Sequence, residues 1–285
     1  MIAVLLGVFA ALSWSLHDLV ARVYAQRLGP MRVALAVIMT GGLILTPFAF
    51  AGGLWSISLS AAGLSLLLGL AYAGGIGGLF KALSLGPISL VGPFTATYPA
   101  LIVAWNVANG IVPTPLQWLA IAAALAGAVI VSRAGHADGG INTVAKKDMT
   151  KLFAACAISM VCYSASVVIG QKAGALAGEY PATWISRFSA ALVLLPLVRG
   201  ETAAERLAPK HLTGILAMGL FDIMGQIAVN MTGTLPGHEY TSIGIASIGA
   251  TSAILAALVL KERVSLTQWG GIALIVAGIA GVTTG

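Results

Sequence analysis

The sequence predicts an all-α membrane protein in which ten transmembrane helices form two inverted repeats of five helices each. Three observations predict this class: the composition, the number of long apolar segments and an internal repeat. Of the 285 residues, 59% are hydrophobic and only 8% are charged, whereas soluble domains carry about 25% charged residues. The mean hydropathy is +0.98, so most of the chain is suited to lipid rather than to water.

Apolar segments account for nearly the whole chain. A helix that crosses a bilayer needs about 20 mainly apolar residues, and in hydrocarbon only a helix or a closed barrel satisfies its own backbone polar groups. The sequence lacks the short alternating strands of a barrel. The first segment has no basic N-terminal region, so we expect it to be structural rather than a signal peptide. The expected spans are 2–20, 33–51, 60–83, 87–107, 116–133, 151–171, 182–198, 211–232, 239–260 and 267–284.

The third observation is the internal repeat. The segment "AALSWSLHDLV" leads to "LILTPF" in the first half, and "AISMVCYSASVV" leads to "LVLLPL" in the second. Tyr163 thus follows Trp14 by 149 residues, and the prolines of the two shorter segments share that offset. Further on, "QWLAIAAALAGAVI" at 117–130 is echoed by "QWGGIALIVAGIAG" at 268–281, an offset of 151 residues. A nearly constant offset across five spans indicates a duplication.

The odd number of spans in each copy makes the repeat an inverted one. Five spans leave the chain on the opposite face, so the second copy enters the membrane the other way up. We expect a first repeat at 1–134, a polar linker at 135–150 and a second repeat at 151–285. Inverted repeats are typical of secondary transporters, which bind their substrate near the midplane between the two halves.

The basic residues predict the orientation, because Lys and Arg gather in cytoplasmic loops. Thirteen of the 15 Lys and Arg residues fall after odd-numbered spans, which places those loops in the cytoplasm and both termini in the periplasm. They are Arg22, Arg27, Arg32, Lys81, Arg133, Lys146, Lys147, Lys151, Arg199, Arg206, Lys210, Lys261 and Arg263.

Several classes of function have no support in the sequence. Enzymatic motifs such as HExxH, GxSxG and the Walker loop are missing, so we expect no enzyme and no ATP-driven transport. The two cysteines, Cys156 and Cys162, lie in one expected helix and suggest neither a disulfide framework nor a metal site. The basic residues are scattered and form no nucleic-acid patch. We therefore expect no cofactor, no metal and no nucleic-acid partner.

The strongest candidate for a site is Asp222, halfway along the eighth span. A carboxylate there costs on the order of 2.5–3.5 kcal/mol even on the milder insertion scales. Gln226 and Asn230 follow at i+4 and i+8, which places all three on one helix face. A polar stripe at this depth indicates a water-accessible cavity in which Asp222 meets a substrate amine or a proton. The alternative is a structural carboxylate bound to a neighbouring helix.

Further candidates lie in the first and sixth spans. Trp14 and its repeat mate Tyr163 are both aromatic, and together they would flank a midplane site. His17 is a substrate-binding candidate as well. The alternative for His17 is a place near the headgroups, while Asp18 can pair with Arg22 one turn on.

Three other features complete the set. Tyr98 precedes Pro99, which frees a carbonyl and permits a kink, so its hydroxyl has reason to face the cavity. Arg187 is expected to reach outward along its stem to the headgroups, with attraction of substrate carboxylates as the minor alternative. The four glycines of "YAGGIGGLFKAL" favour close helix packing.

Two segments resemble a known family. "LVLKERVSLTQWGGIALIVAGI" resembles the closing signature of the EamA domain of the drug/metabolite transporter superfamily, and "KALSLGPISLVGPFTATYPALIVAW" resembles its third-to-fourth helix segment. The resemblance covers nearly the whole chain and implies ten helices in two inverted repeats around a cavity. The bacterial YddG-type amino-acid exporters look closest in length, and their aromatic positions map onto Trp14, Tyr98 and Tyr163.

These expectations combine into one reading of the chain. We expect a multi-pass protein of the bacterial inner membrane that exports amino acids and related amphipathic metabolites by alternating access, with protons as a candidate coupling ion. One alternative is a carrier of another small solute, such as an organic cation, a nucleobase or a sugar. Another is a scaffold or enzyme within the membrane that transports nothing. The oligomeric state is left open.

Overall fold

The computed structural model is all-helical over the residues it describes. These are 1–85, 91, 95, 97–134, 146–199, 201, 205, 207–259 and 265–284. The helices are α1 (Ile2–Leu28), α2 (Pro30–Ala51), α3 (Leu59–Leu85), α5 (Tyr98–Ala108), α6 (Pro115–Ala134), α7 (Lys146–Ala177), α8 (Glu179–Val198), α9 (Leu212–Met231), α10 (Thr241–Ile245), α11 (Ile248–Val259) and α12 (Leu266–Thr284). Short 3-10 turns are η1 (Leu54–Ser56), η3 (Pro209–His211), η4 (Thr232–Thr234) and η5 (His238–Tyr240).

Within this described part, seven helical segments are long and apolar enough to cross a membrane, and three shorter ones are apolar. They fall on the ten expected spans with two differences. The ninth span is broken between α10 and α11. Of the fourth, 87–107, the structure describes mainly the later part, as α5. The expected linker lies outside the described residues from 135 to 145.

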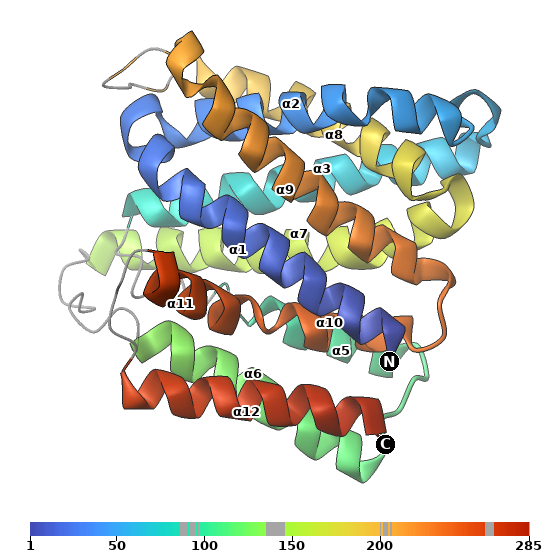
Figure 1. Ribbon diagram of the computed structural model, residues 1–285, viewed down its shortest axis with the longest axis vertical. Coiled ribbons are helices and arrows are strands. Elements are labelled where there is room, and N and C mark those ends of the chain that lie inside the picture. Colours follow the sequence, from blue (N-terminus) through green and yellow to red (C-terminus); the bar gives the residue numbers. More distant parts are fainter. Residues whose placement is uncertain are drawn as a thin grey trace.

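The helices lie side by side in one bundle (Figure 1). The pair α2 and α8 forms one edge and the pair α6 and α12 forms the other, with the remaining helices between them. Both chain termini lie at the same end of the bundle, which we call the terminal end. The opposite end, where α1, α3, α6, α8 and α11 finish, is called the basic end because the loops that carry most Lys and Arg follow these helices.

The two halves run in opposite directions, as the odd number of spans predicts. In Figure 1, α7 runs against α1, α8 against α2, α9 against α3 and α12 against α6. The packing repeats in the same sense: α1 lies on α9 as α3 lies on α7, and α2 lies on α9 as α3 lies on α8. The pairs α2–α8 and α6–α12 each join a helix to its own repeat mate. The halves are therefore related by a pseudo-twofold axis that lies in the membrane plane.

Close glycine contacts show how accurate this symmetry is. A Cβ on Gly127 of α6 would lie 2.5 Å from the carbonyl oxygen of Gly271 in α12. A Cβ on Gly278 of α12 would lie 2.5 Å from the carbonyl oxygen of Ala120 in α6. Gly278 follows Gly127 by 151 residues, and Gly271 follows Ala120 by the same offset, so the two contacts are equivalent. Small residues thus let the two helices of this edge approach closely from either side.

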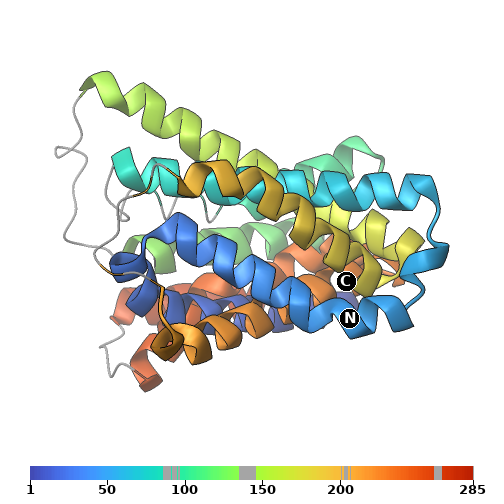
Figure 2. The ribbon, with the colours of Figure 1, turned by 90° about the horizontal axis from the view of Figure 1, so that it is seen from above.

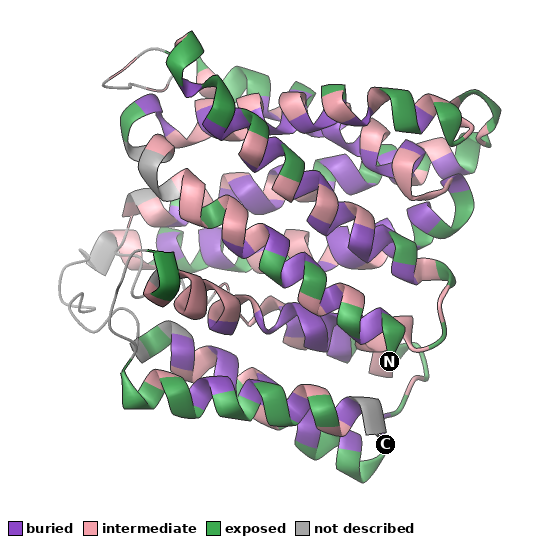
Figure 3. Ribbon diagram, viewed as in Figure 1, coloured by how far each residue is buried: buried purple, intermediate pink, exposed green. Residues whose placement is uncertain are grey.

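Burial follows the pattern of a protein in lipid (Figure 3). Large apolar side chains such as Leu119, Leu192 and Val276 are exposed on the outside of the bundle. Many of the interior positions are small or polar, among them Ser159 and Ser186. The apolar exterior is what lipid solvates, and small residues let the helices approach one another closely.

At the basic end, one carboxylate joins the two halves. Glu201 follows α8, and its side-chain oxygens accept hydrogen bonds from the backbone N–H groups of Met31 (2.8 Å) and Arg32 (2.9 Å). These groups open α2 and have no partner within the helix. The negative charge also complements the positive end of the helix dipole. Of the basic loop residues that predict orientation, Arg206, Lys261 and Arg263 lie outside the described part of the chain.

Candidate functional site

A buried ion pair lies at the centre of the bundle. In α8, Arg187 is 1% exposed and its Nη2 lies 3.0 Å from Oδ2 of Asp222 in α9, which is 2% exposed. Tyr72 of α3 donates a hydrogen bond of 2.6 Å from its hydroxyl to Oδ1 of Asp222. The expectation that Arg187 reaches outward to the headgroups is wrong. The long stem of arginine suggested that the charge could reach the headgroups, but the opposite charge on α9 holds the guanidinium inside.

The ion pair lies on the pseudo-twofold axis. Tyr72 and Asp222 are separated by 150 residues, between the offsets of 149 and 151 found before and after these helices, so they occupy equivalent positions in α3 and α9. Two equivalent residues that touch one another must lie next to the axis itself. Since the axis lies in the membrane plane, the pair is at mid-bilayer. The position equivalent to Arg187 is Ile38, so the cation belongs to one half only.

The guanidinium of Arg187 has hydrogen-bond donors that no described residue accepts. Nε, Nη1 and Nη2 of Arg187 find no well-directed hydrogen-bond acceptor among the described residues, and Oδ2 of Asp222 finds no donor there. The contact of 3.0 Å between Nη2 and Oδ2 is thus close but poorly directed. The ring of Tyr72 stacks on the guanidinium at 4.5 Å from the ring centroid. A buried pair of this kind recovers its cost of desolvation only with full hydrogen bonding, which this pair lacks.

A row of tyrosines leads away from the ion pair. The ring of Tyr163 lies 6.3 Å from that of Tyr72 and 6.0 Å from that of Tyr98. All three side chains are half-buried, in contrast with the buried Arg187 and Asp222. We call these three residues the tyrosine row. It offers aromatic faces and hydroxyl groups together, which suits an amphipathic ligand.

Trp14 and Tyr163 are related as the repeat predicts. A Cβ on Gly75 would lie 2.7 Å from the ring of Tyr163, and a Cβ on Gly225 would lie 2.6 Å from the indole of Trp14. Gly75 and Gly225 are themselves repeat mates. Each aromatic side chain therefore rests on the equivalent glycine of the other half. The indole N–H of Trp14 is buried and has no acceptor among the described residues.

We predict that Gly75→Ala displaces Tyr163, because the added methyl group has no room beneath the ring. Gly77→Ala is the matched control, since nothing lies within 4 Å of a Cβ at that position of the same helix. Overpacking costs about 1–3 kcal/mol, so Gly75→Ala should lower thermal stability in detergent while Gly77→Ala should not. Equal melting temperatures for the two variants would contradict the contact.

The predicted residues of α1 lie toward the basic end of the site. His17 Nδ1 is 2.9 Å from Oδ1 of Asp18. Asp18 therefore pairs with His17. The alternative pair with Arg22 falls on a side chain outside the described part of the structure.

Gln226 and Asn230 form a chain of amides below Asp222. Gln226 Nε2 donates to Oδ1 of Asn230 (2.9 Å), and Asn230 Nδ2 donates to Oγ1 of Thr183 in α8 (2.9 Å). Both amides are buried, and a Cβ on Gly170 of α7 would meet Asn230. They share the helix face of Asp222, as predicted, and here they bind α9 to its neighbours.

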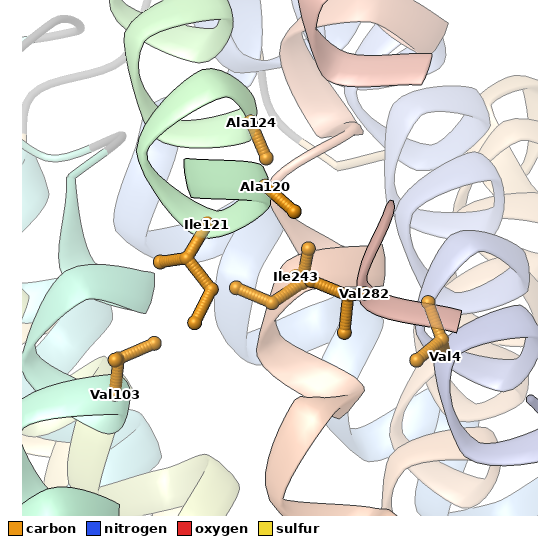
Figure 4. Packing of buried hydrophobic residues seen from close by; sticks show 7 residues of the cluster. All are labelled: Val4, Val103, Ala120, Ile121, Ala124, Ile243 and Val282. Carbon is orange, nitrogen blue, oxygen red and sulfur yellow. The ribbon is translucent and has the colours of Figure 1, made fainter. Parts of the chain in front are cut away.

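Apolar side chains close the bundle at the terminal end. One buried cluster takes residues from five helices, α1, α5, α7, α9 and α10, namely Ala10, Ile102, Val167, Ala228, Val229 and Ile245. A second buried cluster, drawn in Figure 4, consists of Val4, Val103, Ala120, Ile121, Ala124, Ile243 and Val282. Polar contacts reinforce them, as Gln171 Nε2 donates to Thr232 and to the carbonyl of His238, both at 2.9 Å.

Two equivalent positions at the basic end are more exposed than their mates at the terminal end. Val167 is 3% exposed, whereas its repeat mate Asp18 is exposed over 56% of its side chain. Val4 is 2% exposed, whereas its mate Phe153 is 37% exposed. Figure 2 shows α7 inclined to the other helices, with its first turns at the outer edge of the basic end. The two halves are thus alike in sequence pattern and differ in how they pack at the two ends.

Tyr72 is the site residue that the sequence reasoning missed. The sequence could have indicated Tyr72, because it is the repeat mate of Asp222, and repeat mates near the axis are candidates for contact. The partnership of Arg187 also had a signal, since a cation and an anion in separate membrane spans stabilise one another when paired.

Comparisons with known proteins give a family match and a fold match. The family model described as the EamA-like transporter family matches residues 1–133 and 150–284. Among 28 matching chains of solved structures, one titled "Crystal structure of protein" has a TM-score of 0.79 and 19% sequence identity, and the alignment covers 99% of this chain and 97% of that chain. No curated protein matches the sequence.

Proposed function

Because the chain belongs to the EamA-like transporter family, we propose that it is a secondary transporter that exports amino acids, aromatic and apolar ones above all, across the bacterial inner membrane by alternating access. The match occurs once in each half and covers nearly the whole chain. A membrane transporter with a small-molecule substrate is therefore the class, and the substrate and the mechanism are the proposal.

One observation carries the mechanism: the repeat mates at the two ends of the bundle differ in burial. In an inverted repeat, each half has access to the conformation of the other. If they exchange conformations, the apolar clusters of the terminal end separate while Asp18 and its neighbours close over the basic end. The central site would then face the other side of the membrane.

The tyrosine row and Trp14 support an amphipathic cargo. Aromatic faces from Tyr98, Tyr163 and Trp14 accept an apolar side chain, and His17 borders the site on α1. We assign Asp222 to the amine of the substrate. Gln226 and Asn230 extend the same polar face, and Asn230 holds α8 against it.

The loop charges support the direction. With the basic loops in the cytoplasm, both termini lie in the periplasm and the open end of this structure faces the cytoplasm. An exporter loads its substrate in that state. Asp222 is also a place where a proton can bind, so a proton gradient is a candidate driving force.

A counterflow assay tests the proposal. Purified protein in liposomes preloaded with unlabelled phenylalanine should accumulate external labelled phenylalanine, tryptophan and leucine above the level of empty liposomes. Trp14→Ala should reduce the initial rate about tenfold or more, because a site aromatic contributes on the order of 1.5 kcal/mol. Trp55→Ala, at an exposed position of η1, should keep the initial rate of the unmodified protein. Accumulation of an organic cation, nucleobase or sugar but of no amino acid would contradict the proposed substrate.

A further inference from the structure

We propose that Arg187 and Asp222 together form a recognition site for zwitterions and that Tyr72 covers this site while it is empty. The inference rests on the proposed function and goes beyond it by assigning both charged groups of the cargo. Arg187 would bind the carboxylate and Asp222 the ammonium group. Tyr72 would leave both when a ligand enters.

The charges of the pair match an α-amino acid. The guanidinium and the carboxylate lie 3.0 Å apart, and an amino acid carries its ammonium and carboxylate on a single carbon. When such a ligand enters, one contact between protein charges is replaced by two contacts with the ligand. Every buried charge then keeps an opposite partner. A ligand with only one of the two groups leaves a protein charge unpaired, which is costly at this depth.

The pair has unused hydrogen-bonding capacity. All three guanidinium nitrogens of Arg187 lack a well-directed acceptor among the described residues, as Oδ2 of Asp222 lacks a donor. Arginine binds carboxylates best through two parallel N–H groups, and here it makes one poorly directed contact. A purely structural pair would be expected to satisfy these atoms. A ligand carboxylate supplies the missing geometry.

Tyr72 touches both charges at once. Its ring stacks on the guanidinium of Arg187 at 4.5 Å, and its hydroxyl donates to Asp222 at 2.6 Å. On its other side it meets Tyr163 in the tyrosine row. Tyr72 is half-buried, while the two charges are buried. Tyr72 therefore stands between Tyr163 and the ion pair, and a rotation about its Cα–Cβ bond would uncover both charges.

The test compares phenylalanine with two analogues that each lack one charge. Phenethylamine lacks the carboxylate, and 3-phenylpropionate lacks the ammonium group. Each competes with labelled phenylalanine for the purified full-length protein. We expect phenylalanine to bind at least tenfold more tightly than either analogue, because a site built for both groups rejects a ligand that leaves one unpaired.

Charge variants then assign the groups. Arg187→Gln should weaken the binding of phenylalanine tenfold or more and leave the binding of phenethylamine unchanged. Asp222→Asn should also weaken the binding of phenylalanine tenfold or more and leave the binding of 3-phenylpropionate unchanged. The double variant removes both charges, keeps a neutral interior and should bind all three ligands alike. Arg187→Lys keeps the charge without the planar fork and should give an intermediate loss. Arg133→Gln, at the exposed end of α6, is the control for charge alone.

Tyr72→Phe tests the cover. The variant keeps the stacked ring and loses the hydrogen bond to Asp222, so the empty site becomes easier to open and phenylalanine should bind more tightly. Transport of phenylalanine with equal affinity for both analogues, or a preference that survives in the double variant, overturns this inference and leaves the proposed function standing. A protein that neither binds nor transports any amino acid overturns both.

Discussion

Replacing Arg187 by Leu is expected to destabilise the protein by about 3–5 kcal/mol, the cost of breaking a buried ion pair and leaving one charge alone. Asp222 is 2% exposed in this conformation, and within the described part of the chain the hydroxyl of Tyr72 is the partner that remains to it. Few single substitutions have effects of this size. The measurement is the free energy of unfolding in detergent, or the midpoint temperature of loss of the monodisperse protein.

The double variant Arg187→Leu/Asp222→Leu distinguishes this cause from a general loss of packing. Removing both charges leaves none unpaired, and buried pairs are often replaced by apolar residues at little cost. The double variant should therefore be more stable than Arg187→Leu alone, with a coupling energy of about 1–3 kcal/mol. It should also have lost phenylalanine transport. Additive effects of the two substitutions would mean that the contact contributes nothing specific.

The second large effect is expected from Val167→Asp. Val167 is buried in the closed terminal end, while its repeat mate is already an aspartate, Asp18, at the open basic end. A carboxylate at position 167 costs on the order of 2.5–3.5 kcal/mol while that end is closed and little when it is open. Such a difference shifts the ratio of the two states roughly 100-fold toward opening of the terminal end.

Thiol labelling measures this shift. Ile102 lies in the same apolar cluster as Val167, so Ile102→Cys should be unreactive alone and reactive when combined with Val167→Asp. The native Cys156 and Cys162 are first replaced by Ala. Val167→Ala is the control, since it removes volume and adds no charge. If Ile102→Cys stayed protected beside Val167→Asp, the cluster would not be a gate.

The helices and the inverted duplication could be predicted because the bilayer leaves few alternatives. Hydrocarbon requires helices of a set length, and an odd number of spans in each repeat determines the inversion. The break between α10 and α11 could not be predicted in the same way, because the ninth segment has the length and mean hydropathy of one continuous span. Hydropathy reports burial in lipid and not the continuity of a helix.

The site could be predicted only in part. Asp222, Trp14 and Tyr163 are conspicuous in the sequence, the first as a charge in an apolar run and the others as aromatic repeat mates. The direction of Arg187 was derivable only from Asp222, the opposite charge in a separate span, because the pattern of its own helix does not tell which face meets protein and which meets lipid. The closed end could not be derived either, since two nearly symmetric halves encode both conformations and the difference between them depends on packing.

Reciprocal labelling of Asp18→Cys and Val167→Cys tests alternating access most directly, in protein without native cysteines and with a reagent that cannot cross the membrane. Without substrate, Asp18→Cys should react from the side of the basic loops and Val167→Cys should be protected. During phenylalanine counterflow, Val167→Cys should become reactive from the opposite side as the reactivity of Asp18→Cys falls. Reaction of both positions from the same side, or reactivities unchanged during transport, would contradict an inverted pair of halves that exchange conformations.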